Sequence, residues 1–487
     1  MSGIRIGLLI SLSERYVLAL VSLASSMIVA RLLSPEEIGI YSVSVAVIAI
    51  AQVLRDFGVG SFLVQVRELT EDVVRTAFGL SLIVGVGLFA IVFAMAPIAA
   101  RFYAEPALIE TLFISSFNFL ILPFCSISMA ILRREMRFKQ IAIVNVVAAI
   151  AGAIAVVTAA RMGAGPNSMA ISSIVLSLTT GLGTWFAREN ARFLLPSLSR
   201  WRELLKYSSQ ATAASAVTSV SVNSNDLVLG KVLGFGPVAI LSRAQGLMNL
   251  FHRDMMTAVR NVAFPAFANA HRNNEQLEPR YISSVTALTA FAWPFYGILA
   301  LFPLEITRLL FGDQWDLSVP LVPVFAIAGA VSATVNLAQP LVIASGRIDL
   351  ATRAELIVQP MRFALIAVTA VVFESVFACA MAYLAMSVVS LPVFYWFKGK
   401  VVKNDFRQLL SGLGKSGQIS LLTLLVPGLV SLLGDWSRTT PLSLTATLGA
   451  MLAALVAWPI SLQLFAHPLT RDPAYLRLKQ RLLGDRS

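Results

Sequence analysis

The stretch YSSQATAASAVTSVSVNSND (Tyr207–Asp226) decides the fold, because it is long enough to cross a membrane and yet carries a polar stripe. Its polar residues recur at spacings of three and four, which places them on one face of a helix. They are Ser208, Thr212, Ser215, Ser219, Asn223 and Asp226. Lipid offers these groups no hydrogen bonds, so the stripe must face protein or water. The sequence therefore predicts that it lines a hydrated central cavity.

The segment that follows, up to Pro265, repeats this pattern on a second helix. Ser242, Gln245, Asn249 and Arg253 form a similar stripe, with Arg243 beside it. Two polar helices in hairpin are therefore expected to face the same cavity, and the rest of the chain is expected to form its walls.

The composition is that of a membrane protein. Of the 487 residues, 57% are hydrophobic and only 13% are charged, whereas a soluble domain carries about 25% charged residues. Apolar runs of about twenty residues recur from end to end, and alternating ten-residue strands are absent. The predicted fold class is all-α, a polytopic membrane protein with about 14 transmembrane helices.

The predicted spans fall into two sets of six and a final pair. They are 6–29, 38–54, 76–96, 109–132, 141–160 and 169–187; 207–229, 238–259, 282–304, 321–344, 356–373 and 376–397; and 419–433 and 442–465. Most of the 38 lysine and arginine residues fall in the loops of one side, which predicts that both termini are cytoplasmic. This distribution also explains the net charge of +12 without nucleic acid, since no basic domain lies outside the spans.

The two sets of six resemble an internal repeat. With an offset of 200, ARLLSPEEIGIYS (Ala30–Ser42) aligns with GKVLGFGPVAILS (Gly230–Ser242). Six spans per half give both halves the same orientation, as in transporters whose substrate site lies between the halves. The expected domains are 1–206, 207–400 and 401–487, the last holding two extra helices and a basic cytoplasmic tail.

Three motifs resemble the Wzx-type flippases of lipid-linked oligosaccharides, within the multidrug/oligosaccharidyl-lipid/polysaccharide exporter superfamily. They are ARLLSPEEIGIYSV (Ala30–Val43), RDFGVGSFLVQ (Arg55–Gln65) and LRREMRFKQIA (Leu132–Ala142), and the resemblance covers most of Ser11 to about Lys400. It implies an inner-membrane protein that flips undecaprenyl-pyrophosphate-linked sugar units to the periplasm for O-antigen, capsule or exopolysaccharide assembly. The implied partners are this lipid-linked oligosaccharide, membrane lipids, and glycan polymerase and chain-length proteins. Span seven is richer in Ser, Thr and Asn than the family pattern, so the sugar contacts do not carry over directly.

Arginines inside the spans are the candidates for binding a pyrophosphate, because the guanidinium fork binds phosphate oxygens and stays charged. Arg15, Arg243 and Arg362 are the three that lie within predicted spans. For Arg15 the alternative is snorkelling to the surface beside Glu14, and for Arg362 a structural pair with Glu355.

The candidates for sugar contacts are Ser215, Ser219, Asn223, Gln245 and Asn249. Their amides and hydroxyls suit sugar hydroxyls, although they equally suit bonds between helices. Asp226 is the candidate for coupling to a proton or sodium gradient; alternatively it pairs with Lys231 or caps its helix.

No catalytic domain, cofactor or metal site is expected. The segment LLSGLGKS (Leu409–Ser416) lacks the first glycine of a phosphate-binding loop, and the two cysteines and three histidines show no metal spacing. Three rival functions remain: an ion-coupled multidrug or cation antiporter, which would need an acidic cavity; a glycan polymerase or ligase, which would need a large periplasmic loop; and a membrane scaffold.

Overall fold

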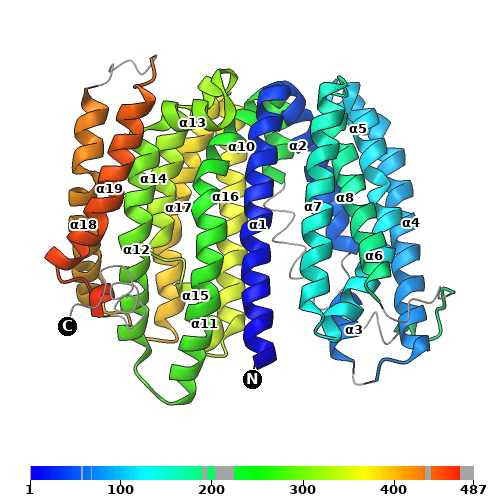
Figure 1. The fold of residues 1–487 in the computed structure, drawn as a ribbon, viewed down its shortest axis with the longest axis horizontal. Helices are drawn as coiled ribbons and strands as arrows, with labels where there is room; N and C mark the ends of the chain where they lie inside the picture. The colour runs from blue at the N-terminus through cyan, green and yellow to red at the C-terminus, as the bar shows by residue number, and fades with distance from the viewer. Residues whose placement is uncertain are drawn as a thin grey trace. The chain divides into compact units, whose positions relative to one another are not determined.

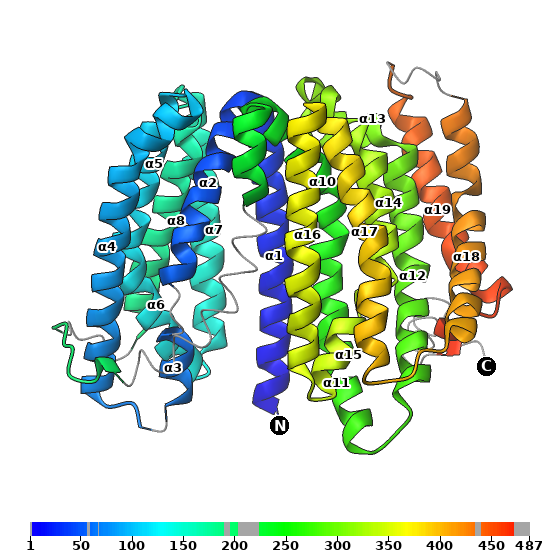
Figure 2. The same cartoon turned by 180° about the vertical axis from the view of Figure 1, so that it is seen from behind.

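The computed structural model describes residues 2–55, 59–66, 68–188, 195–202, 224–433 and 440–471 (Figures 1 and 2). Within these ranges the regular structure is helical and no strand is assigned. The chain divides into two compact units, Met1–Ala239 (unit 1) and Ile240–Ser487 (unit 2). The prediction of an all-α fold is confirmed.

Unit 1 contains long helices joined by short turns. They are α1 (Ser2–Leu32), α2 (Pro35–Arg55), α3 (Val59–Gln65), α4 (Glu71–Tyr103), α5 (Ala107–Ser116), α6 (Asn118–Arg134), α7 (Phe138–Arg161) and α8 (Asn167–Phe186). Residues 224–232 are also helical, and α10 (Phe235–Asn249) begins in this unit.

Unit 2 continues from α10 through a π-helical segment. Its elements are η1 (Leu250–Met255), α11 (Met256–Arg272), α12 (Leu277–Leu301), α13 (Pro303–Phe311), η2 (Asp313–Ser318), α14 (Leu321–Ala333), α15 (Ala338–Ala344), α16 (Ile348–Phe373), α17 (Val376–Gly399), α18 (Phe406–Leu432), α19 (Leu444–Leu464) and η3 (Pro468–Arg471).

Eleven helices in the described ranges are long and apolar enough to cross a membrane, so the chain is a multi-pass membrane protein. They correspond to eleven of the fourteen predicted spans. Of the other three, span 38–54 coincides with α2 and span 238–259 with α10, η1 and the start of α11. Most of span 207–229 lies outside the described residues.

The stretches aligned by the repeat contact each other. Ser34 and Glu37 form a capping box at the start of α2, with the Glu37 amide donating to Ser34 Oγ (3.2 Å) and the Ser34 amide to Glu37 Oε2 (2.8 Å). Glu36 Oε2 accepts a hydrogen bond from the Gly236 amide (3.0 Å). A Cβ on Gly39 would lie 1.9 Å from the Phe235 carbonyl oxygen. Only glycine allows α2 to approach α10 this closely.

Polar side chains join the helices inside unit 1. Asn118 of α6 is buried and lies against α8, where its Nδ2 donates to Ser173 Oγ (2.8 Å) and its Oδ1 accepts from Ser177 Oγ (2.7 Å). Gly85 of α4 lies so close to α6 that an added Cβ would come within 2.4 Å of the Phe119 carbonyl oxygen. Small residues and interhelical hydrogen bonds are what hold helices together where lipid removes the hydrophobic difference.

The last two helices are attached to unit 2 through α12. Thr289 Oγ1 of α12 donates to Ser416 Oγ of α18 (2.9 Å), which in turn donates to the Thr286 carbonyl (3.0 Å). From α19, the Trp458 indole donates to the Ala290 carbonyl (2.8 Å). Unit 2 therefore includes α18 and α19 in its packed core.

Candidate functional site

Ser215, Ser219 and Asn223 lie outside the described residues. Asp226 is half-buried in the helical residues 224–232. Its predicted alternative partner, Lys231, instead donates from Nζ to the carbonyl of Phe102 and lies 4.7 Å from the centre of that ring.

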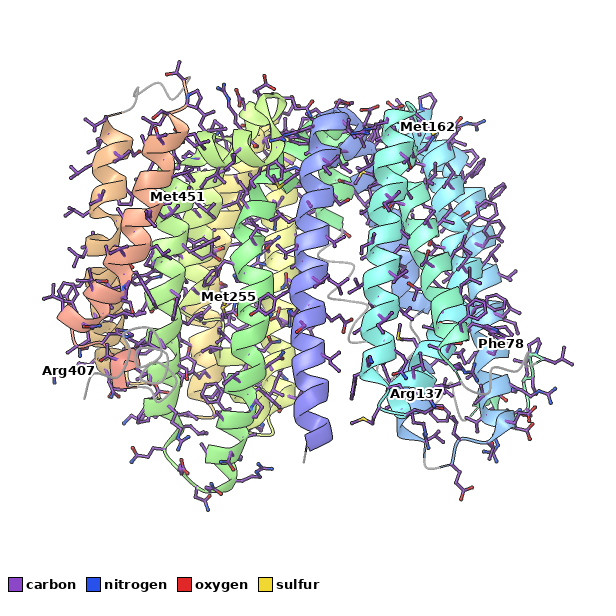
Figure 3. The ribbon with its side chains drawn as sticks, in the orientation of Figure 1. Phe78, Arg137, Met162, Met255, Arg407 and Met451 are labelled. Carbon is purple, nitrogen blue, oxygen red and sulfur yellow. The ribbon has the colours of Figure 1, made fainter. Side chains whose placement is uncertain are left out.

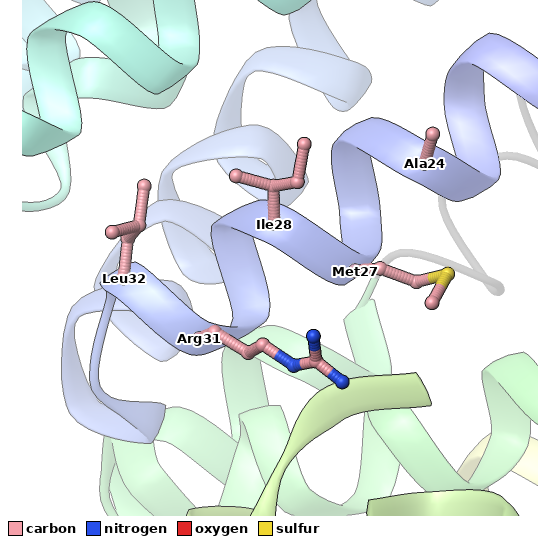
Figure 4. Close-up of a pocket in the computed structure, with 5 residues that line it drawn as sticks. All are labelled: Ala24, Met27, Ile28, Arg31 and Leu32. Atoms are coloured by element: carbon pink, nitrogen blue, oxygen red, sulfur yellow. The ribbon is translucent and has the colours of Figure 1, made fainter. Parts of the chain in front are cut away.

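Arg15 lies on α1 and is half-buried. Its neighbour Glu14 accepts a hydrogen bond from Asn145 Nδ2 of α7 (2.7 Å), so the carboxylate is used to join α1 to α7. A hollow of about 280 Å³ lies farther along α1, between Ala24 and Leu32. Figure 4 shows that α1 supplies its five lining residues, which include Arg31 and none of the predicted site residues.

Arg243 of α10 lies against two aromatic rings. The carbon of its guanidinium is 4.5 Å from the centre of the Phe311 ring and 4.4 Å from that of Trp315, which is fully buried. A guanidinium stacked on two rings gains cation–π attraction. This contact holds the segment from α13 to η2 against α10. The pyrophosphate role of Arg243 stays a prediction.

Gln245 and Asn249 are half-buried near the end of α10. The π-helical segment η1 starts at the next residue, Leu250, and continues to Met255. Such segments are uncommon and often mark functional sites.

Arg362 of α16 takes part in a polar cluster inside unit 2, which we call the arginine cluster: His252, Arg260, Asn336, Arg362 and Tyr383. The guanidinium of Arg362 lies 5.1 Å from the centre of the Tyr383 ring. Asn336 contacts both His252 (Nδ2 to Nε2, 3.2 Å) and Arg260 (Nη1 to Oδ1, 3.5 Å). Arg260 and Arg362 both interact electrostatically with the His252 ring.

Two polar atoms of this cluster are buried without a hydrogen-bond partner among the described atoms, Arg362 Nε and His252 Nδ1. The alternative ion pair of Arg362 with Glu355 does not occur among the described residues; Glu355 Oε2 accepts from Gln359 Nε2 instead (2.9 Å). The residues as a whole are half-buried, so the cluster combines desolvated donors with access from outside.

The three predicted arginines therefore have different recorded contacts. Arg15 lies on α1 in unit 1, Arg243 contacts α13 and η2, and Arg362 belongs to the arginine cluster. The recorded contacts of Arg243 and Arg362 have no residue in common.

Sequence reasoning missed the other members of the cluster. The predicted end of a span at Val259 puts Arg260 in a loop, whereas α11 carries it within a helix that runs to Arg272. His252 is 84 residues from Asn336 in the chain, so no local pattern connects them. The only local signal was the polar stripe leading toward η1.

A family model described as "Polysaccharide biosynthesis protein" matches residues 28–320. Among curated proteins, the chain is 22% identical to the lipopolysaccharide biosynthesis protein WzxC of Escherichia coli over 407 residues, 82% of each chain. It is 23% identical to the teichuronic acid biosynthesis protein TuaB of Bacillus subtilis over 356 residues, 72% of this chain and 73% of the other.

Solved structures share the fold at lower identity. A lipid II flippase, MurJ, in an inward closed conformation gives a TM-score of 0.75 at 11% identity and covers 94% of this chain and 98% of its own. An inward-facing multidrug transporter of the MATE family gives 0.64 at 16% identity, covering 81% and 98%.

Proposed function

Because the chain belongs to the polysaccharide biosynthesis protein family, we propose that it flips lipid-linked oligosaccharide units across the bacterial inner membrane. The substrate is an undecaprenyl-pyrophosphate-linked glycan, which moves from the cytoplasmic to the periplasmic leaflet for assembly of O-antigen, capsule or exopolysaccharide. Both termini lie in the cytoplasm in this proposal. The names of WzxC and TuaB, both polysaccharide biosynthesis proteins, support it.

The observation that carries the proposal is the arginine cluster, with two guanidinium groups in the interior of a membrane protein. An arginine at the centre of a bilayer costs about 2.5–3.5 kcal/mol or more, so it is kept where it meets water or an anion. A pyrophosphate linked to a lipid is such an anion, and it must cross the apolar layer with its charges.

The mechanism that we propose is alternating access. Arginine side chains bind the pyrophosphate, polar residues such as Gln245 and Asn249 bind the sugars, and the lipid tail stays in the bilayer. An ion gradient, with Asp226 as its coupling residue, or consumption of the product supplies the energy. A glycan polymerase and chain-length proteins take up the product.

The rival function is an ion-coupled antiporter, since a MATE family transporter shares the fold. A cation antiporter needs acidic groups in its cavity, whereas the arginine cluster contains no carboxylate among its described members. This difference favours an anionic substrate.

The experiment is the sidedness of a lipid-linked oligosaccharide in liposomes that contain the purified protein. A lectin or glycosidase outside the liposome reports the fraction that has crossed, under imposed proton and sodium gradients. The proposal expects crossing by the wild type and by Arg353→Gln, an exposed arginine of α16, and at least tenfold slower crossing by Arg362→Gln. Failure of the wild type to move its cognate glycan, together with efflux of organic cations, would establish the antiporter instead.

A further inference from the structure

The arginine cluster lies where two irregular backbone segments meet. One is η1, which carries His252. The other is the break between α14 and α15, which carries Asn336 in the middle of the membrane span Leu321–Ala344. Interrupted helices inside a membrane are found where protein groups, a cavity or a ligand satisfy the backbone. The break is held in place by Tyr395, whose hydroxyl donates to the Thr334 carbonyl (2.8 Å).

The hydrogen bonds of Asn336 determine the tautomer of His252. Arginine only donates, so the Asn336 atom that faces Arg260 is its oxygen, and the amide nitrogen then faces His252 Nε2. Because that nitrogen is also a donor, Nε2 must accept. The ring proton therefore lies on Nδ1, which is the buried atom without a partner.

Two donors of the cluster thus remain without an acceptor among the described residues. Arg362 Nε and His252 Nδ1 are buried N–H groups with no partner among the described atoms, and a buried donor left unbonded is destabilising. The Arg362 guanidinium lies 5.1 Å from the centre of the Tyr383 ring, within the range of a cation–π contact. Two guanidinium groups match the charge of a pyrophosphate diester, which carries one negative charge on each phosphate.

We propose that His252, Arg260, Asn336 and Arg362 form a pyrophosphate-binding site within unit 2. Arg260 and Arg362 bind the phosphate oxygens, His252 donates from Nδ1, and Asn336 positions both Arg260 and His252. The assignment of this site rests on the proposed function. In it, residues of η1, α11, α16 and the break after α14 bind the head group of the lipid-linked substrate.

The test is binding of inorganic pyrophosphate, and separately of a short-chain polyprenyl pyrophosphate, to the full chain in nanodiscs by titration calorimetry. The variants are Arg362→Gln and Asn336→Asp, with Arg353→Gln as the matched control on α16. Loss of one charged hydrogen-bond donor should weaken binding of both probes by about 10- to 100-fold. Asn336→Asp adds a carboxylate that competes for the donors, so it should abolish binding while keeping the melting temperature of the wild type.

The proposal is overturned if the wild type binds neither probe, or if both site variants bind as the wild type does. Binding of inorganic pyrophosphate alone would mean that the site holds a free anion, and the assignment to a lipid head group would be wrong. If Arg362→Gln does not fold, binding of the two probes to Asn336→Asp decides whether the proposal stands. The crossing assay tests the function separately from the site. If the site variants lose binding but the wild type does not move the glycan, the site stands and the flippase function is wrong. If the wild type moves the glycan but the variants bind as the wild type does, the function stands and the site is wrong.

Discussion

At the scale of single residues, Lys398 shows that a lysine predicted to lie in a charged loop can be buried in the protein core. It stands near the end of α17 with Lys400 and Lys403 close by in the sequence, and yet its exposed fraction is 0%. Its Nζ donates to Glu278 and to Asn404 Oδ1 (2.8 Å) and lies 4.4 Å from the centre of the Tyr281 ring. This ion pair joins the end of α17 to the start of α12.

Replacing Lys398 by methionine should strongly destabilise the protein. The substitution leaves the Glu278 carboxylate without its cation, and breaking a buried pair in this way costs about 3–5 kcal/mol. The measurement is the thermal unfolding of the purified protein in detergent, with Lys403→Met, an exposed lysine, as the control. Equal melting temperatures for the two variants would contradict a role for the pair.

Arg243 allows a second prediction, because its stacking on Phe311 and Trp315 is a structural contact. Arg243→Gln should lower the free energy of unfolding by about 1–2 kcal/mol through loss of cation–π attraction. It should also change the fluorescence of the protein, since Trp315 loses its neighbour. If the free energy of unfolding of Arg243→Gln equals that of the wild type, the stacking does not stabilise the fold, and only the predicted role of Arg243 in substrate binding is left.

The sequence placed Arg15, Arg243 and Arg362 within predicted spans, but it did not show what surrounds them, and it placed Arg260 in a loop. The selection of Arg362 as a candidate follows from its place in an apolar run, because a charged residue in such a run can be recognised without a structure. Its partner Tyr383 and its neighbours His252 and Arg260 come from three other elements. Only packing brings them together, and no spacing rule reports packing.

At the scale of elements, glycine positions decide how closely helices approach. On α4, Gly85 lies against the backbone of Phe119, whereas Gly87 has no other atom within 4 Å of an added Cβ. The two positions have the same residue in the same helix, and they differ only in the neighbour that α6 supplies.

Alanine at these two positions should have opposite effects on stability. Gly85→Ala forces α4 away from α6 and should cost about 1–3 kcal/mol, as overpacking does. Gly87→Ala should be neutral or gain up to about 1 kcal/mol from helix propensity. Chemical unfolding monitored by helical circular dichroism measures both, and similar values for the two variants would refute the close approach.

At the scale of the whole molecule, the charge distribution predicts which face is cytoplasmic. Arg137 and Met162 lie at opposite ends of α7 (Figure 3). Met136, next to Arg137, and Met162 are both exposed, and Cys125 and Cys379 are buried free cysteines. Cysteines that replace these two methionines would therefore show which side of the membrane each end of α7 faces. The two buried native cysteines should add little labelling of their own.

Met162→Cys should react with a membrane-impermeant maleimide in intact cells, and Met136→Cys only after the membrane is opened. The reason is that Arg133, Arg134 and Arg137 lie near Met136 in the sequence, and basic residues generally concentrate in cytoplasmic loops. The reverse labelling pattern would invert the topology and with it the proposed direction of transport.

The number of spans was largely predictable, since length and hydropathy define eleven of them without packing information. The internal arrangement was less so. The predicted span 238–259 continues as helix to Arg272, because η1 joins α10 to α11 without a turn. A polar residue such as Arg260 can therefore lie in a helix that composition alone would end.

The π-helical segment also has a consequence for the angular phase of everything that follows it. Each π turn takes up about one residue more than an α turn, which rotates the later side chains by about 100° around the axis. A helical wheel drawn through Asn249 at the α period therefore assigns α11 to the wrong faces. Deleting Leu250 would remove one residue and the phase shift together, so Arg260 should keep its face and its contact with Asn336, whereas conversion of η1 to α-helix without a deletion would turn Arg260 away.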